Sequence, residues 1–459
     1  MVLKHNHNDI DAYTAIMDLN IEEAVQKNDN ISKAYEYFRA NLKHDKVSFE
    51  AITNKMLFVV IDLSPEEDEQ QIFDAINSLG VKLTTAELLK NFFFKRDDLQ
   101  AYEAYWKDIF EKDEETKAYW DREVTAGRFR RSFIDLFFYA YLQIKIQDAS
   151  FAVTTEDKTI FTKVDKLFES YKKFIEKYCG GDHKALREEI RNYAKLFRQI
   201  FNPEVVESEL SAEAGIDRLN VIIFYLETTT LIPYLLFVEH NVCDKTIKTE
   251  LYGFIESYIM RRLLTKSSTK NYNQLFTERL ISNHILSKKS FLEFLEKQTD
   301  KVNYLPSDIQ VKEAIGEYVL TNKQATGVLY LIESSIRDHK RHSTQLLGVS
   351  KYSLEHIMPK KWTNHWGMPT DQTLVDERNH KILTLGNLTI ITQALNTSIR
   401  DADWNTKKIG HGTGKAGLEK YAEGIDIFSS FLARTIWDEK AIEDRAAFLY
   451  EKAVAVWSI

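Results

Sequence analysis

The chain has 459 residues, of which 44% are hydrophobic and 28% charged, and its formal net charge at pH 7 is −8. These proportions are ordinary for a globular protein, and the length favours two or three domains over a single one. The sequence has no run of about eighteen apolar residues, which excludes a helical membrane span, and the acidic balance argues against a general nucleic-acid coat protein without excluding a nucleic-acid enzyme.

The numbers of cysteine and of turn-forming residues further restrict the class of protein that the sequence can encode. Cys179 and Cys243 are far apart and form neither a CxxC motif nor a disulfide framework, and the first eight residues lack the apolar core of a signal peptide. Both features predict a cytoplasmic protein. Only 16 Gly and 6 Pro accompany 27 Phe and 22 Tyr, a composition that favours long helices over many short strands.

The first 95 residues mix helix and strand signals. Residues 20–42 have the spacing of an amphipathic helix, and residues 56–63 form a short apolar run that predicts a buried strand. A helix is expected over residues 66–77, and after Gly80 a further helix should begin at Thr84 or Thr85 and run to Phe94. These signals predict a segment of mixed α/β structure over residues 1–95.

Residues 96–340 show repeated helical periodicity and almost no strand signal, which predicts a helical domain. A basic cluster of Arg128, Arg130 and Arg131 precedes the first strongly apolar helix. Pro233 should kink or interrupt the apolar stretch around it. The helices expected here cover residues 132–146, 164–178, 183–201, 221–240 and 254–264.

Basic residues gather near the end of that last helix. Arg261, Arg262, Lys266 and Lys270 are candidates for contact with a DNA backbone, although basic residues at a helix end are also common on solvated surfaces. The composition changes after about residue 342, and we place the last domain boundary near residue 340. The Gly-rich stretch 410–414 lacks the features of a phosphate-binding loop, and residues 441–457 should form the final helix.

The candidate catalytic and metal-binding residues lie within residues 353–408. Glu355 and His356 stand where a strand should end, with Pro359 shortly after them. Hydrolysis of a phosphodiester needs a base for the attacking water and a cation that neutralises charge on the phosphoryl oxygens. We predict that His356 is the general base and that Glu355 binds the metal.

Two asparagines and a lysine complete the pattern. Asn396, on a helix expected after the strand 384–392, is the second predicted metal ligand, and such oxygen donors suit Mg²⁺ or Mn²⁺ better than zinc. Asn387 should orient the imidazole or its loop. Lys407 is placed to assist by touching a phosphate.

Each of these residues has an ordinary structural explanation. A lone Glu-His pair usually marks a solvated strand end, the Asn in Leu385–Leu388 can simply support a turn, and Asn396 can lie on a helix surface. The residues occur together, in order, with an apolar strand between them and a lysine after them. That combination favours the catalytic interpretation of His356.

The residues just described resemble those of a known family. Residues 354–408 are similar to the HNH nuclease domain at the C-terminus of GmrSD-type, modification-dependent (type IV) restriction endonucleases. The resemblance is carried by the segments 355–359, 385–391 and 395–397 and by Trp404 and Lys407. Residues 73–91 resemble the end of the N-terminal domain of these enzymes, and residues 259–273 resemble a helical stretch between the two domains.

The chain departs from the family in two places. Asp401 stands where the family usually has Asn. The family's Asp-Gly-Gln-Gln-Arg motif, linked to nucleotide hydrolysis and sensing, is missing, since residues 68–71 lack both the Gly and the Arg. The resemblance therefore implies that residues 1–95 are a truncated part of the N-terminal NTPase or sensor domain, and that the nucleotide-dependent function is either missing or supplied by another polypeptide.

We expect a mainly α-helical protein with an N-terminal α/β remnant, a helical domain at 96–340 and a ββα-metal (HNH) nuclease domain at 341–459. By resemblance, it should be an Mg²⁺- or Mn²⁺-dependent DNA endonuclease of a modification-dependent restriction system, acting on modified phage DNA. Two alternatives stay open: a non-catalytic fragment that binds DNA or a partner subunit, and a toxin-like nuclease of the same fold that cuts RNA.

Overall fold

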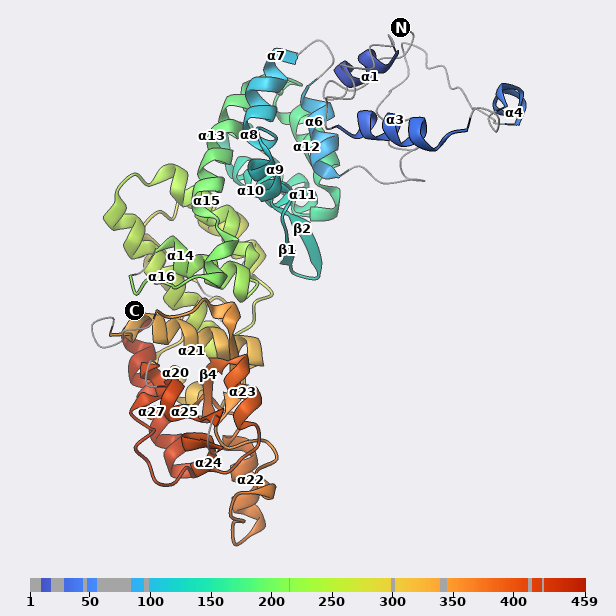
Figure 1. Cartoon of the computed structure of the whole chain (residues 1–459). Helices are drawn as coiled ribbons and strands as arrows, with labels where there is room; N and C mark the ends of the chain where they lie inside the picture. The colour runs from blue at the N-terminus through green and yellow to red at the C-terminus, as the bar shows by residue number, and fades with distance from the viewer. Residues whose placement is uncertain are drawn as a thin grey trace. The chain divides into compact units, whose positions relative to one another are not determined.

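The computed structural model describes residues 10–17, 29–43, 48–55, 84–94, 99–213, 215–298, 302–338, 345–411, 415–422 and 425–459. The chain divides into two compact units, Met1–Lys82 and Leu83–Ile459 (Figure 1). Most described residues are helical, as the composition predicts. Within these residues, none of the helices combines the length and the apolar character that crossing a bilayer requires.

The first unit contains three described helices, α1 (Ile10–Met17), α3 (Asn30–Asn41) and α4 (Phe49–Lys55). Helix α3 begins after Asp29, whose carboxylate accepts a hydrogen bond of 2.8 Å from the backbone N–H of Ser32. This helix covers the second half of the expected helix 20–42. Residues 20–28, the expected strand 56–63 and the expected helix 66–77 lie outside the described residues.

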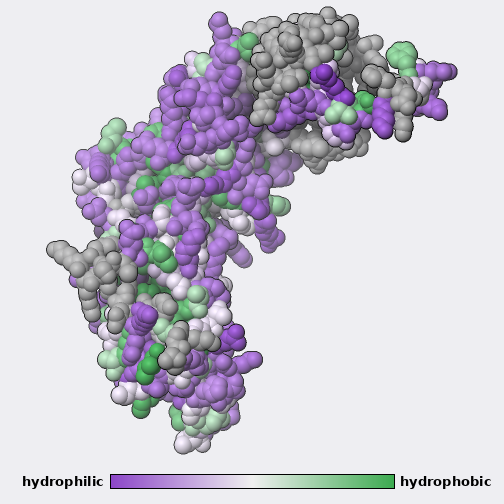
Figure 2. Space-filling view, viewed as in Figure 1, coloured by the Kyte–Doolittle hydropathy of each residue, from purple (hydrophilic) through white to green (hydrophobic). Residues whose placement is uncertain are grey.

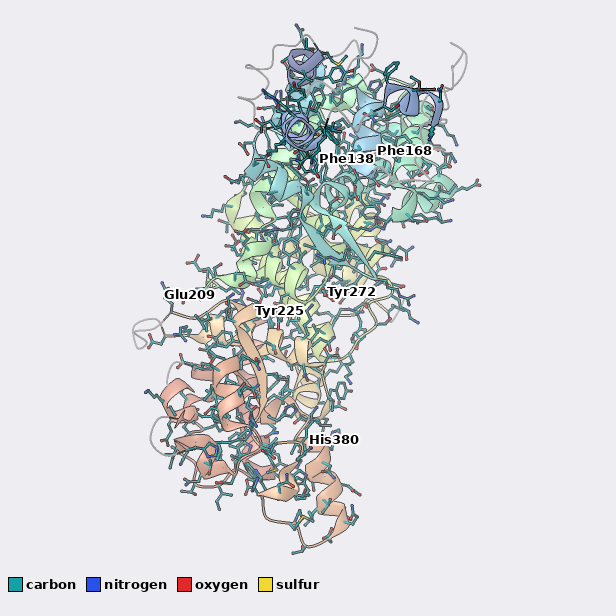
Figure 3. The ribbon with its side chains drawn as sticks, turned by 45° about the vertical axis from the view of Figure 1, so that its right-hand side comes forward. Phe138, Phe168, Glu209, Tyr225, Tyr272 and His380 are labelled. Atoms are coloured by element: carbon teal, nitrogen blue, oxygen red, sulfur yellow. The ribbon has the colours of Figure 1, made fainter. Side chains whose placement is uncertain are left out.

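The second unit starts with a helical region in which aromatic side chains form much of the core. Almost every residue of α10 is buried, and Trp106 stacks on Phe138 with ring centroids 5.6 Å apart. Figure 3 shows Phe138 and Phe168 among these helices. The region's main helices are α6 (Thr85–Phe93), α9 (Glu114–Asp121), α10 (Phe133–Gln147), α11 (Thr155–Phe161), α12 (Leu167–Tyr178), α13 (Lys184–Ile200), α14 (Ile216–Asn220), α15 (Ile232–Asn241), α16 (Lys245–Leu264) and α19 (Lys288–Glu296), with the shorter α7 (Leu99–Tyr102), α8 (Asp108–Phe110), α17 (Tyr272–Gln274) and α18 (Leu280–Ser282).

Local signals place most of these helix ends. Thr84 and Glu87 form a capping box at the start of α6, and the Ser132 hydroxyl caps α10. Gly180 and Gly181 follow α12 with φ angles of 61° and 76°, a backbone conformation that glycine adopts without a steric penalty. The helices predicted over 132–146, 164–178 and 183–201 are confirmed to within a few residues.

Two sequence-based expectations for this region are wrong. Residues 221–240 do not form one central helix. The stretch is interrupted, as one of the two predicted alternatives has it, but the break lies between the π-helical segment Val221–Tyr225 and α15, so that Pro233 falls in the first turn of α15 and not at the break. A proline is favourable there, where its missing N–H has no helical partner. A β-hairpin of β1 (Glu123–Ala126) and β2 (Phe129–Ser132) occupies a stretch for which no strand was expected.

The C-terminal part of the unit surrounds a two-stranded antiparallel sheet, β3 (Tyr352–His356) and β4 (Leu388–Thr392). Helix α21 packs on both strands, and α27 packs on α20. The other elements are α20 (Asp308–Glu317), α21 (Asn322–Ile336), α22 (Gln372–Lys381), α23 (Gln393–Ile399), α24 (Trp404–Ile409), β5 (Gly410–His411), β6 (Lys415–Ala416), α25 (Leu418–Ala422), α26 (Asp426–Ser429) and α27 (Glu439–Val456).

A buried polar network joins the two parts of this unit. Arg218 pairs with Glu256 on α16 and donates to the Ser334 hydroxyl on α21 at 2.8 Å. The indole of Trp457 donates to the same Glu256 carboxylate at 2.9 Å. The described residues on the face drawn in Figure 2 are by contrast largely hydrophilic, with scattered apolar side chains.

Candidate active site

Strands β3 and β4 pair with one another across a connection that contains α22, and helix α23 follows β4 directly. Glu355 lies opposite Thr389, and His356 lies opposite Leu388. The Thr392 side chain accepts from the backbone N–H of Leu395 and so begins α23 directly after β4. Because α21 and α23 both pack on the strands, β4 is buried almost throughout and its sequence is a continuous apolar and threonine run.

Glu355 and His356 line one pocket of about 220 Å³. Consecutive residues of a strand normally face opposite sides of the sheet. Here β3 ends at His356 and the chain bends at residues 357–358, and both side chains reach the same pocket. The remaining lining residues are Pro359, Lys360, Lys361, Asn396, Arg400, Asp401 and Lys407.

A buried ion pair forms one wall of the pocket. The Lys407 ammonium, on α24, donates to Oε1 of Glu355 and, at 2.8 Å, to the backbone carbonyl of His356. The Lys407 side chain is 0% exposed and that of Glu355 is 8% exposed. Burial raises the pKa of Glu355 and lowers that of Lys407, and each charge counteracts part of the other's shift.

The imidazole of His356 is held in its neutral form. Burial, followed by the positive charges of Lys360 and Lys407, lowers the pKa of His356 from an ordinary 6.5 to about 4. At neutral pH the ring therefore has a nitrogen lone pair that can accept a proton. This is the state that a general base needs.

The two asparagines have different environments. Asn396 is half-buried and lines the pocket, and its amide nitrogen donates to the Leu354 carbonyl at 3.3 Å. Among the described residues no donor contacts its amide oxygen. Asn387 is completely buried outside the pocket and bonds to both the N–H and the C=O of Met358, at 2.9 and 2.8 Å. It therefore fixes the backbone that follows His356 and does not touch the imidazole.

Helix α27 holds the turn that carries Asn387. A Cβ on Gly386 would lie 2.3 Å from the Ile442 carbonyl oxygen, so only glycine fits this close approach. The fully buried Arg445 donates to the carbonyls of Leu385, Gly386 and Leu388 at 3.0, 3.0 and 2.6 Å. Burial lowers the pKa of Arg445 to about 9.

Arg400 stands on the pocket rim with a strained backbone. Its φ is 38° and its ψ −130°, a conformation that L residues rarely adopt. Its Nε donates to the Thr397 carbonyl at 3.1 Å. Within the described part of the chain no carboxylate pairs with its guanidinium, which is exposed.

The pocket offers oxygen donors for a divalent cation. Searched over the described residues, the chain has no group of three His, Cys, Asp or Glu side chains that could hold a metal ion. Glu355 and Asn396 nevertheless supply a carboxylate and an amide oxygen to one pocket, and Asp401 lines it as well. This set fits Mg²⁺ or Mn²⁺, which bind through one or two carboxylates and keep several waters, better than zinc.

The four predicted DNA-contacting residues separate into two pairs. Arg261 and Arg262 are 1% and 0% exposed. Arg261 bonds to the carbonyls of Trp457 and Pro306, and Arg262 to those of Tyr304 and Ser268. The expectation that these two arginines contact DNA is therefore wrong, because both are buried. Lys266 and Lys270 are exposed, and their contact with DNA stays a prediction.

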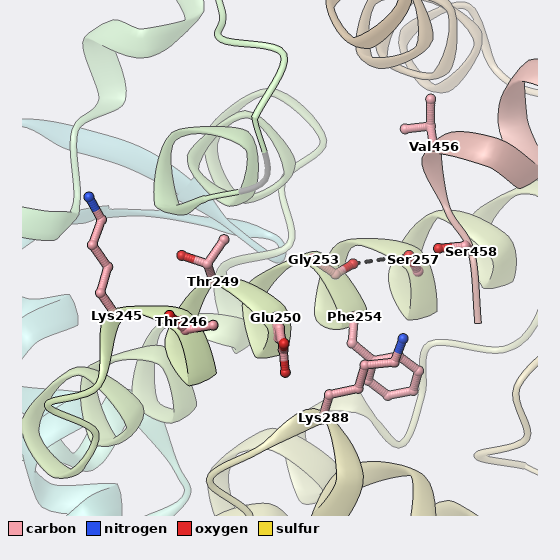
Figure 4. A pocket seen from close by; sticks show the side chains of 10 residues that line it. All are labelled: Lys245, Thr246, Thr249, Glu250, Gly253, Phe254, Ser257, Lys288, Val456 and Ser458. Carbon is pink, nitrogen blue, oxygen red and sulfur yellow. Dashed lines mark hydrogen bonds between the residues drawn. The ribbon is translucent and has the colours of Figure 1, made fainter.

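A larger pocket, of about 690 Å³, lies along α16 (Figure 4). Its walls include Lys245, Glu250 and Phe254 from α16, Lys288 from α19 and Ser458. The Lys288 ammonium lies 5.9 Å from the centre of the Phe254 ring. None of the residues predicted to be catalytic or metal-binding lines it.

Sequence reasoning missed several residues that shape the site. Lys360 and Lys361 directly follow the Glu-His segment, so their position alone could have identified them. Arg445 and Trp437, whose indole donates to Asn387 Oδ1 at 3.0 Å, lie far along the chain. No local pattern marks these two, because their role depends on tertiary packing.

Two family models match the chain. The C-terminal domain of GmrSD restriction endonucleases matches residues 305–452, and the N-terminal domain of GmrSD restriction endonucleases matches residues 3–94. The C-terminal match contains every residue that lines the His356 pocket, and it begins ahead of the boundary expected near residue 340. No curated protein matches the chain.

Proposed function

We propose that this chain, which carries both domains of a GmrSD restriction endonuclease, hydrolyses DNA phosphodiester bonds in the pocket around His356. The observation that carries the proposal is the pocket itself. It combines an imidazole kept neutral, a buried carboxylate, an amide oxygen and several cationic side chains. This is the set of groups that an HNH-type nuclease would need.

His356 is the proposed general base. Its neutral ring takes a proton from a water molecule while the water oxygen bonds to phosphorus and the bond from phosphorus to the leaving sugar oxygen breaks. A bound phosphate brings negative charge next to the ring, and such a charge raises the pKa of a histidine. Substrate therefore brings the pKa of His356 closer to the working pH.

Glu355 and Asn396 would hold the divalent cation. When bound, Mg²⁺ or Mn²⁺ would supply positive charge to the phosphoryl oxygens and the leaving group. The Lys407 ammonium already bonds to Glu355 and to the His356 carbonyl. We therefore assign Lys407 to positioning the carboxylate and the strand end, in place of the direct phosphate contact expected from the sequence.

The exposed side chains on the rim would bind the rest of the substrate. Lys360, Lys361 and Arg400 are exposed and line the pocket, and cationic side chains at such positions neutralise phosphates next to a scissile bond. The family assignment favours modified DNA as the substrate, within a restriction system directed against foreign DNA such as that of phages.

A plasmid-nicking assay with Mn²⁺ tests the proposal. The unaltered chain should convert supercoiled plasmid to nicked or linear DNA, and His356→Ala should not. His380→Ala is the matched control, because His380 is an exposed histidine on α22 paired with Glu317 at 3.4 Å. Equal cutting by the chain and His356→Ala would refute the assignment.

The same assay separates the two alternatives. Binding of DNA without cutting by any form would favour a non-catalytic binding fragment. Cutting of RNA but not of DNA, when both are offered together, would favour a toxin-like nuclease. A modified plasmid has to be included beside an unmodified one, since the chain's family acts in modification-dependent restriction.

A further inference from the structure

The β1–β2 hairpin is an isolated two-stranded sheet that projects from the helical region (Figure 1). Its strands are antiparallel, with Ala126 opposite Phe129, and two residues, Gly127 and Arg128, form the turn. Gly127 has a φ of 65°, as the first central position of a tight hairpin turn often requires. The hairpin is therefore a well-formed element with its turn exposed.

The tip of the hairpin presents an aromatic ring to solvent. Phe129 is 67% exposed. Its cross-strand neighbour, Ala126, is too small to cover the ring. The Arg131 guanidinium lies 5.9 Å from the ring centroid, so one face of the hairpin combines an exposed aromatic side chain with a cation.

Positive charge is concentrated at the same place. Arg128, Arg130 and Arg131 fall within four residues of a chain whose net charge is −8. Arg130 pairs with Glu123 across the strands at 3.3 Å. Arg128 is exposed and has no acidic partner among the residues that the structure describes.

Folding of the hairpin does not account for these side chains. A two-stranded hairpin is marginally stable in water, and neighbouring arginines repel one another. Phe129, with 67% of its surface exposed, gains little from burial. The combination does have a use in binding, since cations neutralise phosphates and an aromatic ring stacks on or between bases.

We propose that the β1–β2 hairpin is a second DNA-binding element, in which Arg128 and Arg131 contact phosphates and Phe129 contacts bases. A two-stranded ribbon fits the major groove of duplex DNA, while the deep, narrow major groove of duplex RNA does not admit side chains. The proposal rests on the proposed function in so far as that function makes DNA the substrate.

The charge contribution is tested by salt dependence. The full chain is mixed with a short fluorescein-labelled DNA duplex in EDTA, and affinity is measured by anisotropy at several salt concentrations. The slope of log affinity against log salt is negative, and each lost phosphate contact makes it less steep by about 0.9. Arg128→Gln/Arg131→Gln should therefore make the slope less steep by about 1.8. Lys289→Gln, which removes the charge of a side chain 88% exposed on α19, should leave the slope nearly unchanged.

The aromatic contribution has a different signature. Phe129→Thr keeps a residue that favours strands and should weaken binding about fivefold or more with the salt slope unchanged. A duplex containing 2-aminopurine should brighten when the unaltered chain binds and should brighten less with Phe129→Thr. The control is Ile309→Thr, which removes an apolar side chain that is 79% exposed on α20.

The outcomes separate this proposal from the proposed function, because binding in EDTA does not depend on cutting. An unchanged salt slope in the double arginine variant, or unchanged affinity and 2-aminopurine signal with Phe129→Thr, would overturn the proposal even if the chain cuts plasmid. Conversely, the predicted binding changes would support it even if no cutting occurs. Matching circular dichroism spectra and unfolding midpoints establish that the variants are folded.

Discussion

Lys407 pairs with Glu355 from a position 52 residues farther along the chain, and both side chains are almost completely buried. Removing one partner of a buried pair leaves an uncompensated charge, which typically costs about 3–5 kcal/mol. We therefore expect Lys407→Met to lower the free energy of unfolding by about that amount and to abolish plasmid nicking. Urea unfolding measures the first effect.

The double variant Glu355→Gln/Lys407→Met tests whether the uncompensated Glu355 charge causes the loss of stability. It removes both charges and should recover most of the lost stability without recovering nicking. Lys408→Met is the neighbouring control. Lys408 forms a long ion pair of 3.9 Å with the half-exposed Glu419 and a long bond of 3.4 Å to the Arg434 carbonyl, so its loss should lower stability by much less than the loss of Lys407. Equal destabilisation by Lys407→Met and Lys408→Met would contradict the assigned role.

His356 predicts a specific pH dependence. Its pKa is about 4 in the folded chain and ordinarily 6.5, so between these values the unfolded state binds more protons than the folded state. Stability should consequently rise with pH across this window and fall as the pH drops through it. Urea midpoints in EDTA at pH 4.5 and 7 should differ less in His356→Ala than in the unaltered chain.

The pH dependence of cutting should follow the same group. The dependence of kcat/KM on pH reports the essential base of the free enzyme. Activity should therefore persist below pH 6.5 and decline only as the pH approaches the lowered pKa of His356. A decline of kcat/KM centred at pH 6.5 would show that the pKa of His356 in the working enzyme is not lowered by burial and the neighbouring lysines.

Asn387 and Asn396 should respond differently to alanine. Asn387→Ala leaves the buried indole N–H of Trp437 and the N–H of Met358 without their acceptor, at a cost of about 1–3 kcal/mol each. Asn396 makes a single bond of 3.3 Å. Asn396→Ala should lower the free energy of unfolding by less than about 1 kcal/mol and yet abolish nicking. Thermal unfolding and nicking, measured together, therefore distinguish Asn387, which supports the fold, from Asn396, which is proposed to bind the cation.

Arg400 predicts a gain of stability with a loss of function. Arg400→Gly relieves a backbone conformation that costs about 1–3 kcal/mol in non-glycine residues, and should raise the unfolding midpoint. The same change removes a charged contact to phosphate and should slow nicking about tenfold or more. Arg400→Lys should retain part of the activity because the charge remains.

The matched control for Arg400 is Ala152→Gly. Ala152 is exposed, has a φ of 49°, and loses only a methyl group on substitution. It should not slow nicking, whatever its effect on the unfolding midpoint. A fall in the unfolding midpoint of Arg400→Gly, with nicking intact, would mean that the arginine serves the fold.

The sequence predicted the order of the elements around the pocket because their signals are local. The apolar run of β4 and the Thr392 cap of α23 can be seen without tertiary information. The same holds for the helices that end at Gly180-Gly181 or begin at Ser132. Pro233 was misjudged because proline signals both an interruption within a helix and a favourable first turn.

The interior electrostatics could not be predicted in this way. Arg261 and Arg262 look like an exposed basic helix end, yet each donates to backbone carbonyls from distant segments. Likewise, the sequence suggests that Lys407 touches phosphate, and only the packing of α24 on β3 shows its ammonium bonded to Glu355. A charged residue's partners depend on tertiary contacts, which residue type and spacing do not reveal.

The support of the Asn387 turn has a consequence for protein synthesis. Arg445 binds the carbonyls of this turn from 60 residues downstream of Leu385, and Trp437 bonds to Asn387 from 50 residues downstream. Residues 437 and 445 are synthesised well after this turn. During translation the Asn387 turn therefore lacks both contacts, and we expect the pocket to finish folding only after residue 445 has been made.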